Sequence, residues 1–61
     1  MRAKFVGRDN VYHDAQSREG LIGTILEEVP YSDNDTKYVY FMPDCWNGSS
    51  AITDRKDLVI L

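Results

Sequence analysis

Few residues of this 61-residue chain are of the types that do chemistry. His13 and Asp14 are the one adjacent pair of a general base and a carboxylate that could orient it. Nucleophilic catalysis also needs a serine or cysteine within hydrogen-bond reach and donors for the oxyanion. Ser17, Ser49 and Cys45 are candidates, but no spacing indicates that one of them meets the histidine. We therefore expect a solvent-exposed loop histidine and a protein that is not an enzyme.

The metal and cofactor motifs are all incomplete. One cysteine and one histidine cannot fill a structural zinc site. The acidic run at residues 33–35 resembles part of a calcium loop, but Tyr38 and Asp44 stand where an EF-hand needs its glycine and its last glutamate. The segment at residues 20–23 lacks the lysine of a phosphate-binding loop and the third glycine of a dinucleotide motif. We expect no metal ion and no cofactor.

Length and composition narrow the class of protein. The chain is long enough for a single domain, residues 1–61, with a small core. Its net charge of -3 disfavours long-range attraction to nucleic acid or anionic lipid. No apolar run approaches the roughly 20 residues of a membrane helix, and no signal-peptide pattern is present. Because Cys45 cannot form an intramolecular disulfide, we expect a soluble protein in the reducing cytoplasm.

Short apolar runs separated by turn-forming residues predict an all-β fold. Runs rich in β-branched and aromatic residues are typical of strands. Strands are expected at residues 3–7, 20–31, 37–42, 49–53 and 59–61. Their side chains alternate between two faces, which predicts a core. The expected core residues are Ile25, Val39, Phe41, Leu58 and Ile60.

The connections differ in kind. Residues 8–19 are polar and predict a long loop, with a helix over residues 12–19 as the less favoured alternative. Residues 32–36 predict a short acidic hairpin loop. Asn47-Gly48 predicts a type I′ turn, which in a two-residue hairpin would make Trp46 and Ser49 an opposed pair. Residues 54–58 predict a single helical turn capped by Asp54.

Three segments together resemble the SH3-like small-barrel architecture, including KOW-type barrels. Residues 20–25, Gly-Leu-Ile-Gly-Thr-Ile, are similar to the Gly-x-x-Gly-x-Val/Ile run of the second strand. Residues 38–41, Tyr-Val-Tyr-Phe, resemble the third strand, and residues 57–60, Asp-Leu-Val-Ile, resemble the entry to the closing strand. The resemblance implies a five-stranded barrel. The aromatic segments of peptide-binding SH3 domains are missing, so it does not imply recognition of proline-rich peptides.

Aromatic residues suggest a surface for a protein partner. If Val39 and Phe41 point inward, alternation places their neighbours on the opposite face, and Trp46 either extends that face or caps the end of the fold. The candidate partner-binding residues are Tyr38, Tyr40, Met42 and Trp46. Exposed aromatic and methionine side chains are typical of interface cores, although strand tyrosines also cover cross-strand neighbours. Our leading hypothesis is a phage-type or accessory interaction module.

Basic residues near both ends of the chain support a rival hypothesis. First and last strands lie close together in small barrels, which would bring the two basic ends into one patch. Such a patch, with an aromatic such as Tyr12, would bind nucleic acid or the ribosome as KOW-type domains do. The candidate residues are Arg2, Lys4, Arg8, Arg55 and Lys56.

Overall fold

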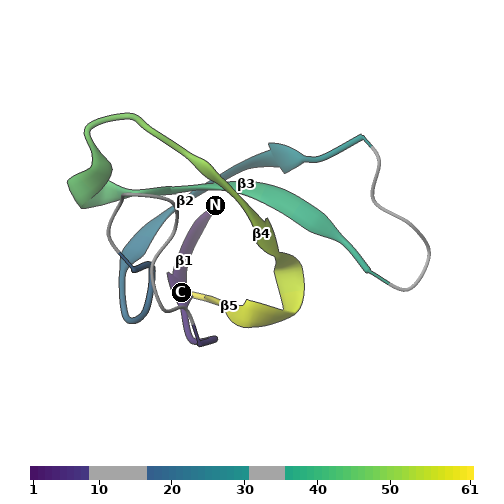
Figure 1. Cartoon of the computed structure of the whole chain (residues 1–61), viewed down its shortest axis with the longest axis horizontal. Helices are drawn as coiled ribbons and strands as arrows, with labels where there is room; N and C mark the ends of the chain where they lie inside the picture. The colour runs from purple at the N-terminus through teal and green to yellow at the C-terminus, as the bar shows by residue number, and fades with distance from the viewer. Residues whose placement is uncertain (9–16, 31–35) are drawn as a thin grey trace.

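A computed structural model describes residues 1–8, 17–30 and 36–61 and shows an all-β chain (Figure 1). The strands are β1 (Arg2–Phe5), β2 (Ile22–Glu28), β3 (Tyr38–Pro43), β4 (Ala51–Asp54) and β5 (Leu58–Ile60). Two single 3₁₀ turns, η1 (Asp44–Trp46) and η2 (Arg55–Asp57), are the helical elements of the described residues. The predicted five strands and the near absence of helix are confirmed, with strand ends shifted by one to three residues.

The five strands form one antiparallel sheet in the order β4-β3-β2-β1-β5. β2 is the longest strand and lies at the centre of the sheet, where it joins one half, β3 and β4, to the other half, β1 and β5. Its beginning pairs with β1, and its pairing with β3 continues to Glu28 across an irregularity after Ile25. β1 runs steeply across the direction of β3, so the sheet is strongly curved (Figure 1). Within the described residues the sheet is open, with β4 and β5 as its two edges.

The helical turn before the last strand forms as the sequence predicts. The side chain of Asp54 accepts a hydrogen bond from the backbone N–H of Lys56 at 3.0 Å, which caps η2. The backbone N–H of Leu58 then donates to the carbonyl of Arg55, and the chain enters β5. The predicted capping aspartate and the apolar run after it therefore correspond to the observed turn.

The Asn47-Gly48 turn forms, but the predicted two-residue hairpin is wrong. Asn47 and Gly48 have φ values of 52° and 90°, and the N–H of Ser49 donates to the carbonyl of Trp46 at 3.0 Å. These are the features of a type I′ turn. It lies inside a longer connection, because β3 ends at Pro43 and η1 intervenes before the turn. Trp46 is thus part of a 3₁₀ turn and not of a strand.

The core lies on the concave side of the sheet. It comprises Ala3, Phe5, Val29, Val39, Phe41, Ala51 and Leu58. The prediction is confirmed for Val39, Phe41 and Leu58, and Ile25 packs against them while partly buried. It is wrong for Ile60, which is 41% exposed. Ile60 is on an edge strand that has no neighbour beyond it, so one flank of its side chain faces solvent.

Arg18 is an unpredicted link between the two halves of the sheet. Its guanidinium donates to the carbonyl oxygen of Ile52 at 3.0 Å and to the Thr53 hydroxyl at 2.8 Å, both on β4. The same group lies 4.8 Å from the centre of the Phe5 ring on β1. The Arg18 side chain therefore satisfies a carbonyl of the edge strand β4 and also packs on Phe5, a core residue of β1.

We expect Arg18→Ala to lower the free energy of unfolding by about 2–3 kcal/mol, because part-buried charge-assisted hydrogen bonds and a cation–π contact are lost together. Urea unfolding measures this effect. Arg8→Ala, which removes an exposed arginine, is the matched control and should change the midpoint little. Equal effects of the two substitutions would show that Arg18 does not hold the halves together.

Candidate functional site

The predicted alternation along β3 is confirmed by its burial. Val39, Phe41 and Pro43 are buried, while Tyr38, Tyr40 and Met42 are half-buried on the opposite side, which we call the outer face. In the register, Tyr40 pairs with Ile52 of β4, Tyr38 with Asp54, and Met42 with Thr24 of β2. Tyr40 therefore covers a half-buried cross-strand neighbour. The three predicted side chains share one face, but none of them is fully exposed.

The more exposed apolar side chains of the outer face lie on β2 and β5. Ile22 is 43% exposed, Leu26 is 51% exposed and Val59 is 48% exposed. The register places Ile22 and Val59 on either side of Lys4, so the three side chains form one row across three strands. Sequence reasoning missed this row because only strand pairing brings together residues so distant along the chain.

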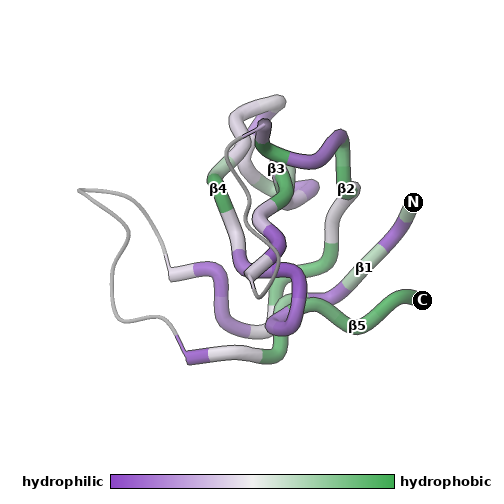
Figure 2. The backbone as a smooth tube through the Cα atoms, turned by 90° about the vertical axis from the view of Figure 1, so that its right-hand side faces the viewer, coloured by the Kyte–Doolittle hydropathy of each residue, from purple (hydrophilic) through white to green (hydrophobic). Residues whose placement is uncertain are grey.

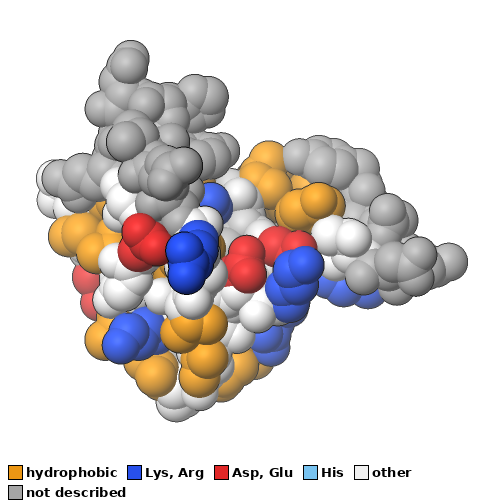
Figure 3. Space-filling view, turned by 60° about the horizontal axis from the view of Figure 1, so that its bottom comes forward, with side chains coloured by type: hydrophobic (Ala, Val, Ile, Leu, Met, Phe, Trp, Pro, Cys, Tyr) orange, Lys and Arg blue, Asp and Glu red, His pale blue; other side chains and the backbone are white. Residues whose placement is uncertain are grey.

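The side of the molecule that carries β5 shows the same mixture. Figure 3 shows hydrophobic side chains on this side bordered by Lys and Arg. In Figure 2 the hydrophobic colouring continues along β5 to the end of the chain. β5 carries the exposed Val59 on the outer face and the exposed Ile60 on the opposite face, and the exposed Leu61 directly follows the strand. Antiparallel sheets with one solvated face normally present polar residues there, so this composition is unusual.

Trp46 lies apart from the strand rows. It occupies the last position of η1 and is half-buried. Its turn follows Pro43 and packs near β2, at the end of β3 opposite to Tyr38. Whether Trp46 contributes to binding stays a prediction.

An ion pair closes the Met42 end of the outer face. The Arg2 guanidinium donates to both carboxylate oxygens of Asp44, at 2.7 and 2.5 Å, and to the Thr24 hydroxyl at 3.1 Å. These hydrogen bonds hold the pKa of the Asp44 carboxyl below its ordinary value and raise the pKa of the Arg2 guanidinium, with partial desolvation opposing both shifts. Asp44 thus compensates part of the charge of Arg2, one of the predicted basic-patch residues.

The Arg2–Asp44 pair predicts a small pH dependence of stability. Because the folded-state pKa of Asp44 is depressed, the pair stabilises the fold above the ordinary carboxyl pKa of about 4. That contribution is lost as the pH falls through the lower folded-state value. Asp44→Asn should therefore lower the melting temperature at pH 7 and match the parent near pH 2, whereas the control Glu27→Gln should differ at neither pH. A deficit of Asp44→Asn that persists in acid would contradict the pair's role.

The predicted basic residues divide between two ends of the β1–β5 pair. β1 and β5 are antiparallel, and the N–H of Leu61 donates to the carbonyl of Arg2. Arg55 and Lys56 precede β5 and thus lie at the opposite end of β1 from Arg2. Lys4 stands between these ends on the outer face, and Arg8 follows β1 on the Arg55 side. The strands are neighbours as expected, but antiparallel pairing separates the first basic residue from the last two.

Several candidates lie outside the described residues. They are Tyr12, His13, Asp14 and the acidic segment 33–35, together with most of the predicted loop 8–19 and its alternative helix. Cys45 is described and exposed. In residues 1–8, 17–30 and 36–61, no three His, Cys, Asp or Glu side chains are grouped as metal ligands. The same residues contain no helix with the length and apolar character needed to cross a membrane.

Comparison with known proteins adds no relative to this picture. No protein-family model, no curated protein and no solved structure matches the chain.

Proposed function

We propose that this protein is a non-catalytic interaction module that docks a protein partner on the outer face of its sheet. The supporting observation is the row of Ile22, Lys4 and Val59, in which two exposed apolar side chains flank one cation across three paired strands. A solvated sheet face gains nothing by exposing such side chains, whereas burial of apolar area is the main driving force for association.

The row also indicates the chemistry of the partner. Lys4 is exposed, and no hydrogen bond or ion pair joins its ammonium group to another described side chain. A partner that buries Ile22 and Val59 would desolvate this ammonium, which costs free energy unless a carboxylate meets it. We propose a partner surface with apolar side chains around an acidic residue. The half-buried Tyr40 and Met42 lie on the same face, on the neighbouring strand β3.

We also propose that the curved sheet is an SH3-like small barrel. The strand order agrees with the resemblance, because β5 returns beside β1 after a helical turn and β2 bends between the two halves. The side chain of Arg18 supports this proposal by bridging β4 to the Phe5 ring where backbone pairing is absent. The architecture carries no function by itself.

Site-specific photo-crosslinking tests the proposed function. A photoreactive phenylalanine analogue is placed at position 22 or 59, and at position 50 as a control in the β3–β4 connection. In cells of the native host, positions 22 and 59 should give the same crosslinked protein band, resistant to nuclease and removed by protease, and position 50 should not. A nuclease-sensitive product would favour the nucleic-acid hypothesis, and a product equal at all three positions would refute the outer-face site.

A further inference from the structure

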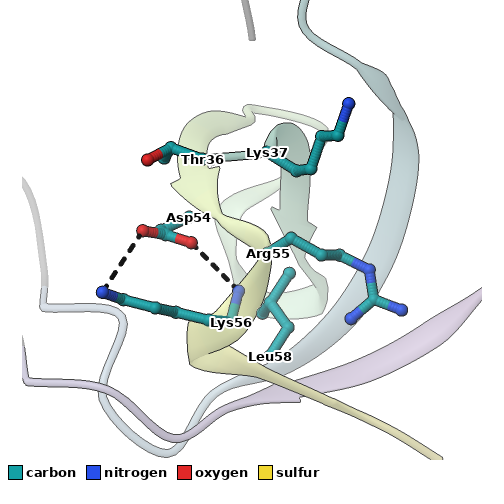
Figure 4. Close-up of a pocket in the computed structure, with 6 residues that line it drawn as sticks. All are labelled: Thr36, Lys37, Asp54, Arg55, Lys56 and Leu58. Atoms are coloured by element: carbon teal, nitrogen blue, oxygen red, sulfur yellow. Dashed lines mark hydrogen bonds and ion pairs between the residues drawn. The ribbon is translucent and has the colours of Figure 1, made fainter. Parts of the chain in front are cut away.

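A pocket of about 360 Å³ opens at the end of the sheet where β3 begins and β4 ends (Figure 4). Its lining comprises Thr36, Lys37, Asp54, Arg55, Lys56 and Leu58. Three of these side chains are cations and one is a carboxylate, on a chain whose net charge is -3. The volume lies in the range of small-molecule sites, which begins at about 300 Å³.

Two of the cations lie opposite each other just beyond the ends of β3 and β4. The last pair in the register is Tyr38 with Asp54, and one step further the N–H of Arg55 donates to the carbonyl of Lys37 at 2.8 Å. Figure 4 shows both side chains reaching to the same side of the ribbon. Like charges directly opposite each other on a sheet are destabilising. An anion bound between them would remove this repulsion.

Among the described residues, the acidic groups near the pocket satisfy only part of its positive charge. Asp54 is engaged by the backbone N–H of Lys56 at 3.0 Å and by its ammonium at 3.8 Å, on the other side of the ribbon from Arg55. Lys37 faces Glu28 at 3.7 Å, but both side chains are more than half exposed, so this pair is weak. No hydrogen bond or ion pair joins the Arg55 guanidinium to another described side chain. As a residue, Arg55 is half-buried.

We infer that this pocket binds a phosphate group, held by the Arg55 guanidinium and the Lys37 ammonium. A guanidinium matches two phosphate oxygens at once, and a dianion compensates both opposed cations. The phosphate can belong to a small phosphorylated molecule or to a nucleic-acid backbone, since the recognised chemistry is the same. This site is separate from the outer-face row, because neither Ile22 nor Val59 lines the pocket.

Titration of the isotope-labelled protein with inorganic phosphate, pyrophosphate and a short single-stranded oligonucleotide tests the site by NMR. Sodium chloride at matched ionic strength is the reference. Saturable shifts should cluster at the backbone amides of residues 36, 37, 55, 56 and 58. If pyrophosphate saturates the site and the oligonucleotide does not bind, the phosphate belongs to a small molecule. If the oligonucleotide binds more tightly than pyrophosphate, the phosphate belongs to a nucleic-acid backbone. Shifts spread evenly over all basic residues, or growing linearly with concentration, would overturn the proposal.

Removing one positive charge at a time, inside or outside the pocket, distinguishes a specific phosphate site from nonspecific attraction of anions to basic residues. Arg55→Gln and Lys37→Gln should each weaken pyrophosphate binding by about tenfold, the usual worth of a charge-assisted hydrogen bond. Lys4→Gln removes the same charge on the outer face and should leave the affinity unchanged. The amide spectra of the variants show whether each remains folded. Equal losses in all three variants, or no loss in Arg55→Gln, would overturn the phosphate site.

Discussion

Replacing Phe41 with alanine is expected to unfold the domain. Phe41 is completely buried and stands between Ile25 of β2 and Ala51 of β4 in the register, so its ring joins three strands. Truncation of a buried phenylalanine costs about 3–5 kcal/mol. A domain of this size has a total stability of about 3–5 kcal/mol, so little remains. Thermal unfolding and urea unfolding of Phe41→Ala should therefore show no cooperative transition.

The matched control for Phe41 is Leu26, an apolar residue of β2 that is 51% exposed. Leu26→Ala should change the free energy of unfolding by no more than about 0.5 kcal/mol, as surface substitutions usually do. Cooperative unfolding of Phe41→Ala near the parent midpoint would place Phe41 outside the core.

The second large effect is expected for Gly23→Ala, because the backbone of β3 lies close to Gly23 of β2. Gly23 pairs with Pro43 and is buried. A methyl group at Gly23 would overlap the carbonyl oxygen of Met42 and lie 2.6 Å from the Cα of Pro43. Both are backbone atoms and cannot turn aside as a side chain does. We expect a loss of about 3 kcal/mol, the upper end of ordinary overpacking, measured by urea unfolding.

Gly48→Ala separates crowding from backbone strain. Gly48 has a φ of 90°, but no atom would meet an added methyl group within 4 Å. Gly48→Ala should lower the free energy of unfolding by about 1 kcal/mol, because an alanine is strained in this left-handed backbone conformation. If Gly23→Ala is as mild as Gly48→Ala, then β2 and β3 are not as tightly packed at Gly23 as the structure indicates.

The positions of the strands along the chain could be predicted, because each strand has a local pattern of apolar residues bounded by turn-forming residues. The run Tyr38 to Met42 alternates with period two, and Asp54 provides a cap for the turn before β5. The length of the β3–β4 connection could not be predicted, because the type I′ turn at Asn47-Gly48 is compatible with both a tight hairpin and a longer loop. Ile60 was misplaced because alternation gives the face of a strand but not its distance from the sheet edge.

The candidate sites depend on long-range pairing, which sequence patterns do not encode. The shared face of Tyr38, Tyr40 and Met42 on β3 could be predicted from alternation within one strand. The row of Ile22, Lys4 and Val59 requires the registers of two strand pairs, and the opposition of Lys37 and Arg55 requires a third. The role of Arg18 was not predicted, because two of the groups it binds, a backbone carbonyl and a hydroxyl, lie more than 30 residues away.

The affinity of the crosslinked partner for a doubly substituted outer face tests the central claim most directly. Ile22→Ser with Val59→Ser removes both exposed apolar side chains of the row and leaves the core residues unchanged, and Arg55→Gln is the control at the pocket. Calorimetric titration should show a loss of about thirtyfold or more for the double variant, on the scale of interface hot spots, with little change for the control. Parent affinity should change little with salt, because apolar contacts are not screened and the pair of Lys4 with the partner's carboxylate would be buried in the contact. An affinity that survives the double substitution and falls steeply with salt would contradict an outer-face protein interface.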